Sequence, residues 1–419
     1  MKKIAVLIAL ITVLSACDKT INKYYVYEPV YTDAETFRTP AAFETPRSFQ
    51  NDGNIYFKDD YLFVVEPNQG IHFIDNSNPS NPVNIGFLNV MGCSGLAIKG
   101  NYLYITALVD MVIVDVSVIT NPVEVGREED IFPTALPLTE KNYPFKEIDK
   151  SKGIVTSFKV IRVKEEANTT SSPVWNNCFN CETMTFSSAD ASSGSGGGSS
   201  TGTAGSFAQM TIVNDHLYVI DMGINKLRPF NIGNPLSPQE GEASWLSWNV
   251  ETIFPHGDYL YMGTTTGMMI YNTVDPMAPQ YVGSISHARA CDPVVVQGNY
   301  AYVTVRSGGS CGGDINQLDV VDVSDKSNPF LKASFNLENP HGLGIDGNTL
   351  FVCDGDAGLK VYDATNPEEA GDHLIKRFKN IQATDVIPLN GVVMVIGDDG
   401  IYQYDYSDPA NLKLLSKLR

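Results

Sequence analysis

The sequence predicts an all-β fold, a seven-bladed β-propeller of four-stranded blades. Two recurring patterns predict it. Apolar strands follow tight Gly-polar turns, as Tyr102–Ile105 follows Gly100-Asn101, and such turns are typical of β-hairpins. A further apolar strand then ends in Asp or Asn, and a proline comes four or seven residues later, as with Asp115 and Pro122.

The Asp or Asn at the end of this strand serves as an anchor that marks each repeat. Successive anchors lie 40, 116, 41, 50, 41 and 42 residues apart. Most intervals are near 40 residues, the length of a four-stranded propeller blade. The seven anchors therefore predict seven blades, and closing them into a ring removes exposed sheet edges. The anchors are Asp75, Asp115, Asn231, Asn272, Asp322, Asp363 and Asp405.

The chemistry of the anchor favours a structural role over a catalytic one. A carboxylate or amide at a strand end accepts backbone N–H bonds from the following turn. The proline then stops the strand and presets the turn. We therefore expect the anchors to shape the turns between the third and fourth strands.

The pattern resembles the bacterial LVIVD repeat, over roughly residues 49–130 and 207–419. The motif appears as Met111–Asp115 and Leu318–Asp322, with Asn-Pro-Val continuations at 81–83 and 121–123. It is degraded in the third and fourth blades, where the anchor is Asn. The resemblance implies a propeller but no single activity, and many members of the family are surface lipoproteins.

The first residues predict export. Lys2 and Lys3 precede an apolar run too short to span a bilayer, which is typical of a signal peptide over residues 1–16. The Leu-Ser-Ala-Cys sequence that ends at Cys17 resembles the lipobox of bacterial lipoproteins. The resemblance implies cleavage before Cys17, acylation, and membrane attachment in the bacterial cell envelope, at the outer membrane. The alternative is an ordinary secretory signal with an incidental cysteine. Residues 17–48 then look like a polar, Tyr-rich tether.

The net charge of the chain is −19, and it becomes −21 once Lys2 and Lys3 are removed. Such an acidic surface repels phosphate backbones, so nucleic acid is not an expected partner. It favours solubility and attracts cations or basic ligands.

Strand order predicts which face of the ring carries function. Inner strands begin at the mouth of the central channel, opposite the Gly-Asn and proline turns. The residues expected there form a series over blades 1 to 7: Gly53, Ser94, Ala208, Glu251, Asp292, His341 and Asp385. Four consecutive blades thus offer acidic or imidazole side chains, which bind a hard cation or a basic ligand, or raise a carboxyl pKa by crowding. The alternative is that they cap neighbouring strand ends.

An insertion of about residues 131–206 separates blades 2 and 3 and leaves from the same face. Its apolar stretch Ile154–Val163 predicts a strand or hairpin, and the Ser/Gly-rich run within 187–206 is typical of a flexible linker. The insertion is either a lid or partner-binding arm, or a tolerated surface insertion.

Cysteine positions suggest two disulfides in an oxidising compartment. Cys291 and Cys311 both belong to the mouth side of blade 5, and Cys178 and Cys181 form a lone C-x-x-C, too little for a zinc site. Cys93 and Cys353 belong to distant blades and are not expected to pair, and Cys353 looks like a buried strand thiol. We expect no metal and no cofactor.

No catalytic motif stands out in the sequence. The favoured hypothesis is therefore a binding or scaffold module of the cell envelope with a protein or glycan ligand. One alternative is an envelope hydrolase or lyase that uses Glu251, Asp292, His341 and Asp385. The other is a purely structural protein without a small ligand.

Overall fold

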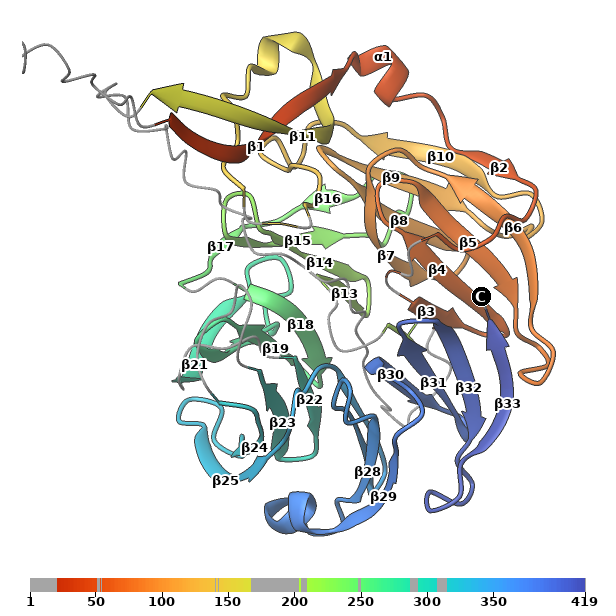
Figure 1. The fold of residues 1–419 in the computed structure, drawn as a ribbon, viewed down its shortest axis with the longest axis vertical. Helices are drawn as coiled ribbons and strands as arrows, with labels where there is room; N and C mark the ends of the chain where they lie inside the picture. The colour runs from red at the N-terminus through yellow and green to blue at the C-terminus, as the bar shows by residue number, and fades with distance from the viewer. Residues whose placement is uncertain are drawn as a thin grey trace, which may run out of the picture.

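The structure is a computed structural model that describes residues 21–50, 53, 55–139, 141, 143–166, 203–204, 209–247, 250–286, 293–306 and 315–418. The described strands form seven antiparallel blades around a central axis (Figure 1). This confirms the predicted seven-bladed all-β propeller. Each blade uses four consecutive strands, ordered from the innermost to the outermost.

The first three blades have these bounds. Blade 1 contains β3 (Ile55–Lys58), β4 (Tyr61–Glu66), β5 (Gly70–Asp75) and β6 (Val83–Asn89). Blade 2 contains β7 (Cys93–Lys99), β8 (Tyr102–Ala107), β9 (Asp110–Asp115) and β10 (Val123–Glu128). Blade 3 contains β13 (Met210–Val213), β14 (His216–Asp221), β15 (Lys226–Asn231) and β16 (Gln239–Glu240), with β17 (Ser244–Trp245) also paired to β15.

The remaining four blades are regular. Blade 4 contains β18 (Val250–His256), β19 (Tyr259–Thr264), β20 (Gly267–Asn272) and β21 (Gln280–Ser286). Blade 5 contains β22 (Val294–Gln297), β23 (Tyr300–Val305), β24 (Gln317–Asp322) and β25 (Phe330–Asn336). Blade 6 contains β26 (Leu343–Asp346), β27 (Thr349–Cys353), β28 (Leu359–Asp363), the 3-10 helix η2 (Pro367–Asp372) and β29 (Leu374–Phe378). Blade 7 contains β30 (Ala383–Leu389), β31 (Val392–Gly397), β32 (Gly400–Asp405) and β33 (Lys413–Leu418).

The anchors act as the sequence predicts. All seven accept a hydrogen bond from the backbone N–H two residues later, as Asp115 does from Ser117 at 2.7 Å and Asn231 from Gly233 at 2.8 Å. In Asp322 the hydroxyl and backbone N–H of Ser324 lower the carboxyl pKa. The anchors are therefore turn-forming residues. They define the turn face of the ring, and the opposite face, where inner strands begin, is called the mouth face below.

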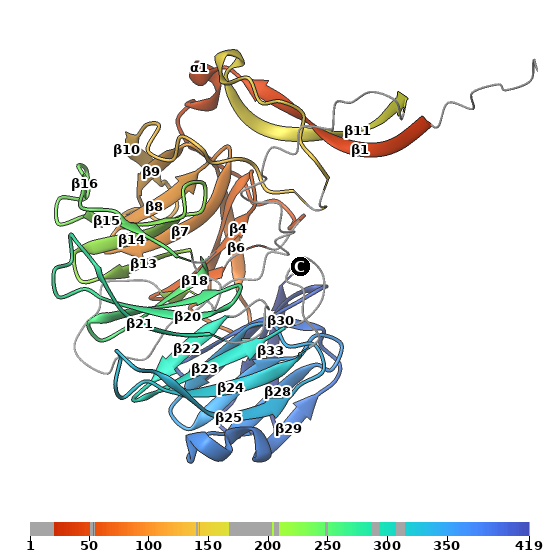
Figure 2. The same cartoon turned by 90° about the vertical axis from the view of Figure 1, so that its left-hand side faces the viewer.

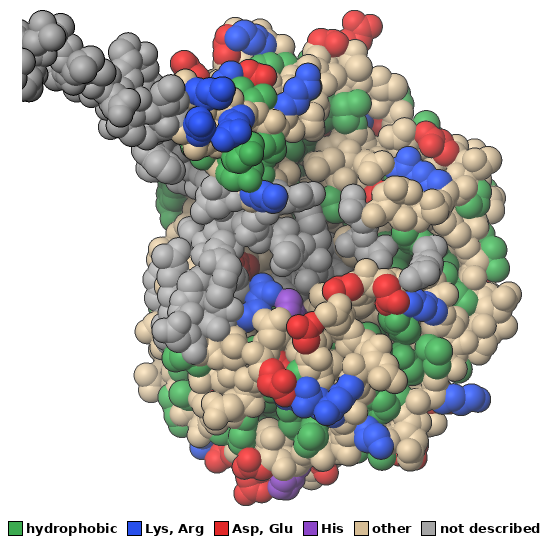
Figure 3. All heavy atoms as spheres, in the orientation of Figure 1, with side chains coloured by type: hydrophobic (Ala, Val, Ile, Leu, Met, Phe, Trp, Pro, Cys, Tyr) green, Lys and Arg blue, Asp and Glu red, His purple; other side chains and the backbone are tan. Residues whose placement is uncertain are grey.

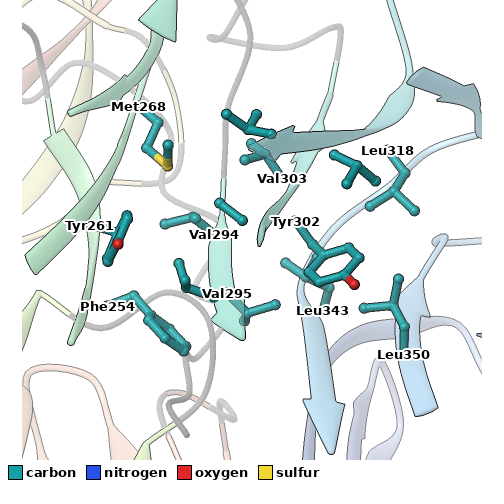
Figure 4. Packing of buried hydrophobic residues seen from close by; sticks show 14 of the residues in the cluster. Phe254, Tyr261, Met268, Val294, Val295, Tyr302, Val303, Leu318, Leu343 and Leu350 are labelled. Carbon is teal, nitrogen blue, oxygen red and sulfur yellow. The ribbon is translucent and has the colours of Figure 1, made fainter. Parts of the chain in front are cut away.

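Packing between neighbouring blades holds the ring together. Figure 4 shows Phe254 and Tyr261 of blade 4 facing Val294 and Val295 of blade 5, with residues of blade 6 beyond them. Apolar side chains lie on both faces of the inner strands, so each blade packs against the blade before it and the blade after it. Burial of this surface is the main stabilising contribution to the fold.

The ring closes through side chains where blade 7 meets blade 1. Ile55 and Leu62 of blade 1 pack with Ile387 and Met394 of blade 7. Asn76 and Gln403 exchange two buried hydrogen bonds, of 3.0 and 2.6 Å. Among the described strands, none from blade 7 joins the sheet of blade 1, and none from blade 1 joins the sheet of blade 7.

The chain before the propeller is folded over much of its length, although residues 17–48 were expected as a tether. β1 (Ile21–Thr32) pairs antiparallel with β11 (Ile154–Glu166), which contains the predicted apolar strand of the insertion. We call this pair the ribbon, and it projects from the propeller (Figure 2). The short helix α1 (Ala34–Phe37) follows, and β2 (Ala42–Glu44) adds to the outer edge of blade 1.

Two further short elements belong to the insertion. The 3-10 helix η1 (Lys150–Lys152) leads into β11, and β12 (Thr203–Ala204) pairs with β3 of blade 1. Most of the Ser/Gly-rich run and Cys17 lie outside the described residues. Among the residues that are described, no helix is long and apolar enough to cross a membrane.

Candidate functional site

The structure places the predicted mouth residues on one face, but it does not describe all of them. Glu251 lies in β18, His341 precedes β26, and Asp385 lies in β30. Gly53 and Ser94 occupy the equivalent places in blades 1 and 2. Ala208 and Asp292 lie outside the described residues.

Arg306, which sequence analysis did not single out, joins two of these residues. It follows β23 directly, and its Nη1 donates a hydrogen bond to His341 Nδ1 at 2.9 Å. The backbone fixes His341, since its N–H donates to Cys353 at 2.7 Å and its carbonyl accepts from the Thr304 hydroxyl at 2.5 Å. Figure 3 shows basic, acidic and histidine side chains close together on this face.

Burial and charge control the protonation of this group. Burial, followed by the positive charge of Arg306, lowers the pKa of His341 to about 3. Burial also lowers the pKa of Arg306, and the charge of Glu251 opposes this shift. His341 is therefore neutral at physiological pH. It accepts a hydrogen bond from the charged Arg306, and the negative charge of Glu251 stabilises that cation. A histidine held in this way positions Arg306 and is poorly suited to act as a general base.

Asp385 lies deeper than this group. Its side chain is fully buried in β30. Its charge, together with burial, raises the pKa of the Cys353 thiol well above the usual range, with burial the larger cause. Asp385 thus contributes to the interior beside blade 6 rather than to the exposed rim of the mouth.

A cavity opens on the same face between blades 2 and 3. Its volume is about 90 Å³. The start of the insertion, at Phe132, Leu136 and Leu138, covers one side, and Met210 and Val219 of blade 3 line another. Most lining side chains are apolar. A cavity of this size and character accommodates one small apolar group, since dry apolar cavities bind aromatic guests.

A few polar groups lie at the edge of this cavity. The hydroxyls of Ser94 and Thr106 are 2.9 Å apart, and Thr106 also donates to the Gly95 carbonyl at 3.2 Å. Asp221, at the end of β14, pairs with Arg228 at 3.2 Å, and burial raises the pKa of its carboxyl although Arg228 opposes the shift. Apolar walls with a few converging polar groups are typical of binding sites.

Two cysteines lie among the described residues, and Cys353 contributes to this site only through its backbone carbonyl. Cys93 and Cys353 are free and buried. The sequence predicts burial for Cys353 but not for Cys93. Burial raises the pKa of the Cys93 thiol, so it is held as an unreactive thiol. The candidate pairs Cys291–Cys311 and Cys178–Cys181 lie outside the described residues. Within the described part of the chain, no group of three or more His, Cys, Asp or Glu side chains is placed to hold a metal ion.

Sequence comparison identifies the repeat. The LVIVD repeat matches residues 53–90, 93–130 and 288–337, which cover the strands of blades 1, 2 and 5. The chain is an LVIVD-repeat β-propeller. No curated protein gives a significant sequence match.

Solved structures resemble this LVIVD-repeat propeller in fold. The periplasmic gluconolactonase of Pseudomonas aeruginosa has a TM-score of 0.54 at 10% identity and covers 87% of this chain and 96% of its own. A protein from Lactobacillus plantarum has a TM-score of 0.50 at 12% identity and covers 87% of this chain and 96% of its own. Identities this low establish a shared fold and carry no activity across.

Proposed function

We propose that this LVIVD-repeat protein is a lipid-anchored binding module of the bacterial cell envelope, which holds a protein or glycan ligand on its mouth face. The observation that carries the proposal is the cavity between blades 2 and 3. Here apolar side chains of the described residues line an open space instead of packing against each other.

The size of the cavity indicates the kind of contact. A volume of about 90 Å³ takes one aromatic or branched aliphatic group, but not a whole glycan chain. The ligand therefore inserts a single apolar anchor, and the rest of its contacts spread over the mouth face. Anchors of this kind, buried in a pocket, contribute much of the affinity of protein interfaces.

The Arg306 and His341 group supplies a second, polar contact region. At the channel mouth, the charged Arg306 donates a hydrogen bond to the neutral imidazole of His341. Burial lowers the pKa of Arg306, and the negative charge of Glu251 opposes this shift. The arrangement favours recognition over hydrolysis, because the Nδ1 lone pair of His341 already accepts a hydrogen bond. This supports a binding module rather than the envelope hydrolase or lyase.

The test of the binding face is site-specific photo-crosslinking in the producing cells. A photoreactive phenylalanine analogue replaces Leu138 at the cavity, and in a matched variant it replaces Asn101, which is exposed on the turn face of blade 2. We expect a discrete adduct from position 138 and none from position 101. Equal adducts from both positions, or none from position 138, would contradict the proposal.

The lipid anchor has a separate test. Mass spectrometry of the N-terminal peptide is expected to show acylated Cys17 at the new N-terminus. In membranes washed at high salt, Cys17→Ser is expected to move the protein from the membrane fraction to the soluble fraction, because burial of acyl CH₂ groups, unlike contacts between exposed charges, holds a protein at the bilayer in high salt. An unmodified Cys17 would contradict the proposed lipid anchor.

A further inference from the structure

The outer end of the ribbon carries a cluster of cations in an otherwise acidic protein. Lys23 lies opposite Lys164 in the ribbon register, and Tyr25 lies opposite Arg162. Paired residues of antiparallel strands share a face, and so do residues two apart on one strand. The three cations and Tyr25 therefore lie on one face of the ribbon, which we call the ribbon tip.

The ribbon tip is exposed, and its cations are not paired with other described residues. Lys23, Arg162 and Lys164 are exposed, and Tyr25 is 46% exposed. Within the described residues, none of the three cations forms an ion pair. Like charges directly opposite each other destabilise a strand pair. The sequence also places Glu165 and Glu166 at the end of β11, which moderates the net charge there.

The position of this tip along the chain suggests what lies against it. Only Asp18, Lys19 and Thr20 separate Cys17 from Ile21, where β1 begins. Four extended Cα–Cα steps span at most about 14 Å. If acyl chains on Cys17 enter the bilayer, the ribbon tip is held within roughly a Debye length or two of the lipid headgroups.

The base of the ribbon ties it to the mouth face. Phe37 and Ile154, at the base, pack against Leu108 and Val109 in the β8–β9 turn of blade 2, which lies on that face. Figure 2 shows the ribbon extending beyond the propeller on one side of the ring. A ribbon tip that rests on the membrane would therefore turn the mouth face toward the bilayer.

We infer that the ribbon tip is a docking surface for anionic phospholipid headgroups. This inference rests on the proposed acylation of Cys17. Lys23, Arg162 and Lys164 approach the headgroup phosphates, and Tyr25 lies at the interface, where tyrosine is enriched in membrane proteins. An anionic surface neutralises the opposed lysines and holds the mouth face over the membrane.

The test uses the mature chain with Cys17→Ser, so that no acyl chain contributes to binding. The probes are vesicles of pure phosphatidylcholine and vesicles that contain phosphatidylglycerol. We expect binding to the phosphatidylglycerol vesicles alone, weakening as salt is raised. The triple change Lys23→Glu, Arg162→Glu and Lys164→Glu is expected to weaken binding about a hundredfold, since each of the three cations contributes roughly fivefold.

The matched control replaces three exposed lysines of blades 6 and 7 and changes the net charge by the same amount. Its substitutions are Lys376→Glu, Lys379→Glu and Lys413→Glu. It is expected to retain most of the binding. No binding of the parent to anionic vesicles, or equal losses in the two triple variants, would overturn the inference. Unfolding midpoints of both variants establish that any loss is not due to unfolding.

The outcome separates this inference from the proposed anchor. Salt-sensitive binding through the tip with an unmodified Cys17 in cells would sustain the docking surface and refute the acylation. Acylated Cys17 with no effect of the tip variant on anionic vesicles would sustain the anchor and refute the docking surface. A tip that serves an acidic protein instead of lipid would leave the anionic vesicles unbound.

Discussion

Arg38 binds Asp110 through two hydrogen bonds, from Nε at 2.9 Å and from Nη2 at 3.0 Å. Asp110 is fully buried at the start of β9, and Arg38 follows α1 in the segment before the propeller. This pair joins the base of the ribbon to the mouth side of blade 2, so it fixes the N-terminal segment to the ring.

Loss of the Arg38–Asp110 pair is expected to destabilise the ribbon more than the propeller. In Arg38→Ala, Asp110 keeps Arg127 at 3.3 Å and the Asp130 N–H at 2.9 Å, so its charge is still partly compensated. We expect the free energy of unfolding to fall by about 1–3 kcal/mol, the usual effect of removing one partner from a buried polar group. Hydrogen exchange should rise first in β1 and β11. Unchanged exchange in the ribbon would contradict this role.

Stability is expected to depend on pH through His341. Its pKa is about 3 in the folded protein and ordinarily 6.5, so below pH 6.5 the unfolded chain binds a proton that the folded chain does not. The contribution of His341 to stability is therefore complete above about pH 6.5 and is lost as the pH falls toward 3.

The measurement compares wild type with His341→Gln by denaturant unfolding between pH 7.5 and 4.5. Wild type should lose more stability than the variant, by up to about 1.4 kcal/mol per pH unit. The comparison is needed because burial also lowers the pKa of His72 and His256. Parallel profiles would show that His341 does not titrate as described.

The cavity between blades 2 and 3 can be filled from Gly95. A Cβ at this position would lie 3.4 Å from Thr106 Oγ1 and 3.9 Å from the Tyr56 hydroxyl, so alanine fits without a clash. We expect Gly95→Ala to change stability by less than about 0.5 kcal/mol. Gly95→Leu reaches further into the cavity and should abolish the adduct expected from position 138 while the protein stays folded. An adduct that persists in a folded Gly95→Leu variant would show that the ligand does not occupy the cavity.

The propeller could be predicted because its signals are local. An anchor such as Asp322 and the turn after it lie within a few residues of each other, and the same arrangement recurs in every blade. The hairpin turns are equally local: Gly100 and Gly298 adopt the left-handed conformation, with φ of 55° and 61°. Such signals can be recognised without knowing what lies elsewhere in the chain.

The ribbon and much of the site depend instead on long-range contacts. Tyr24–Tyr27 has the composition of a strand, but nothing local indicates that it pairs with Val160–Val163. Arg306 follows an ordinary apolar strand, and its role emerges only when the ring brings it to His341. The cavity likewise depends on how the insertion returns over blades 2 and 3.

Mouth residues of distant blades share one face only if the ring closes, with blade 7 in contact with blade 1. The most direct measurement is a double-mutant cycle of Asn76→Ala and Gln403→Ala, two buried residues from the last pair of neighbouring blades. We predict a coupling free energy of about 1–3 kcal/mol in equilibrium unfolding. Effects that add within about 0.3 kcal/mol would contradict contact between the first and last blades.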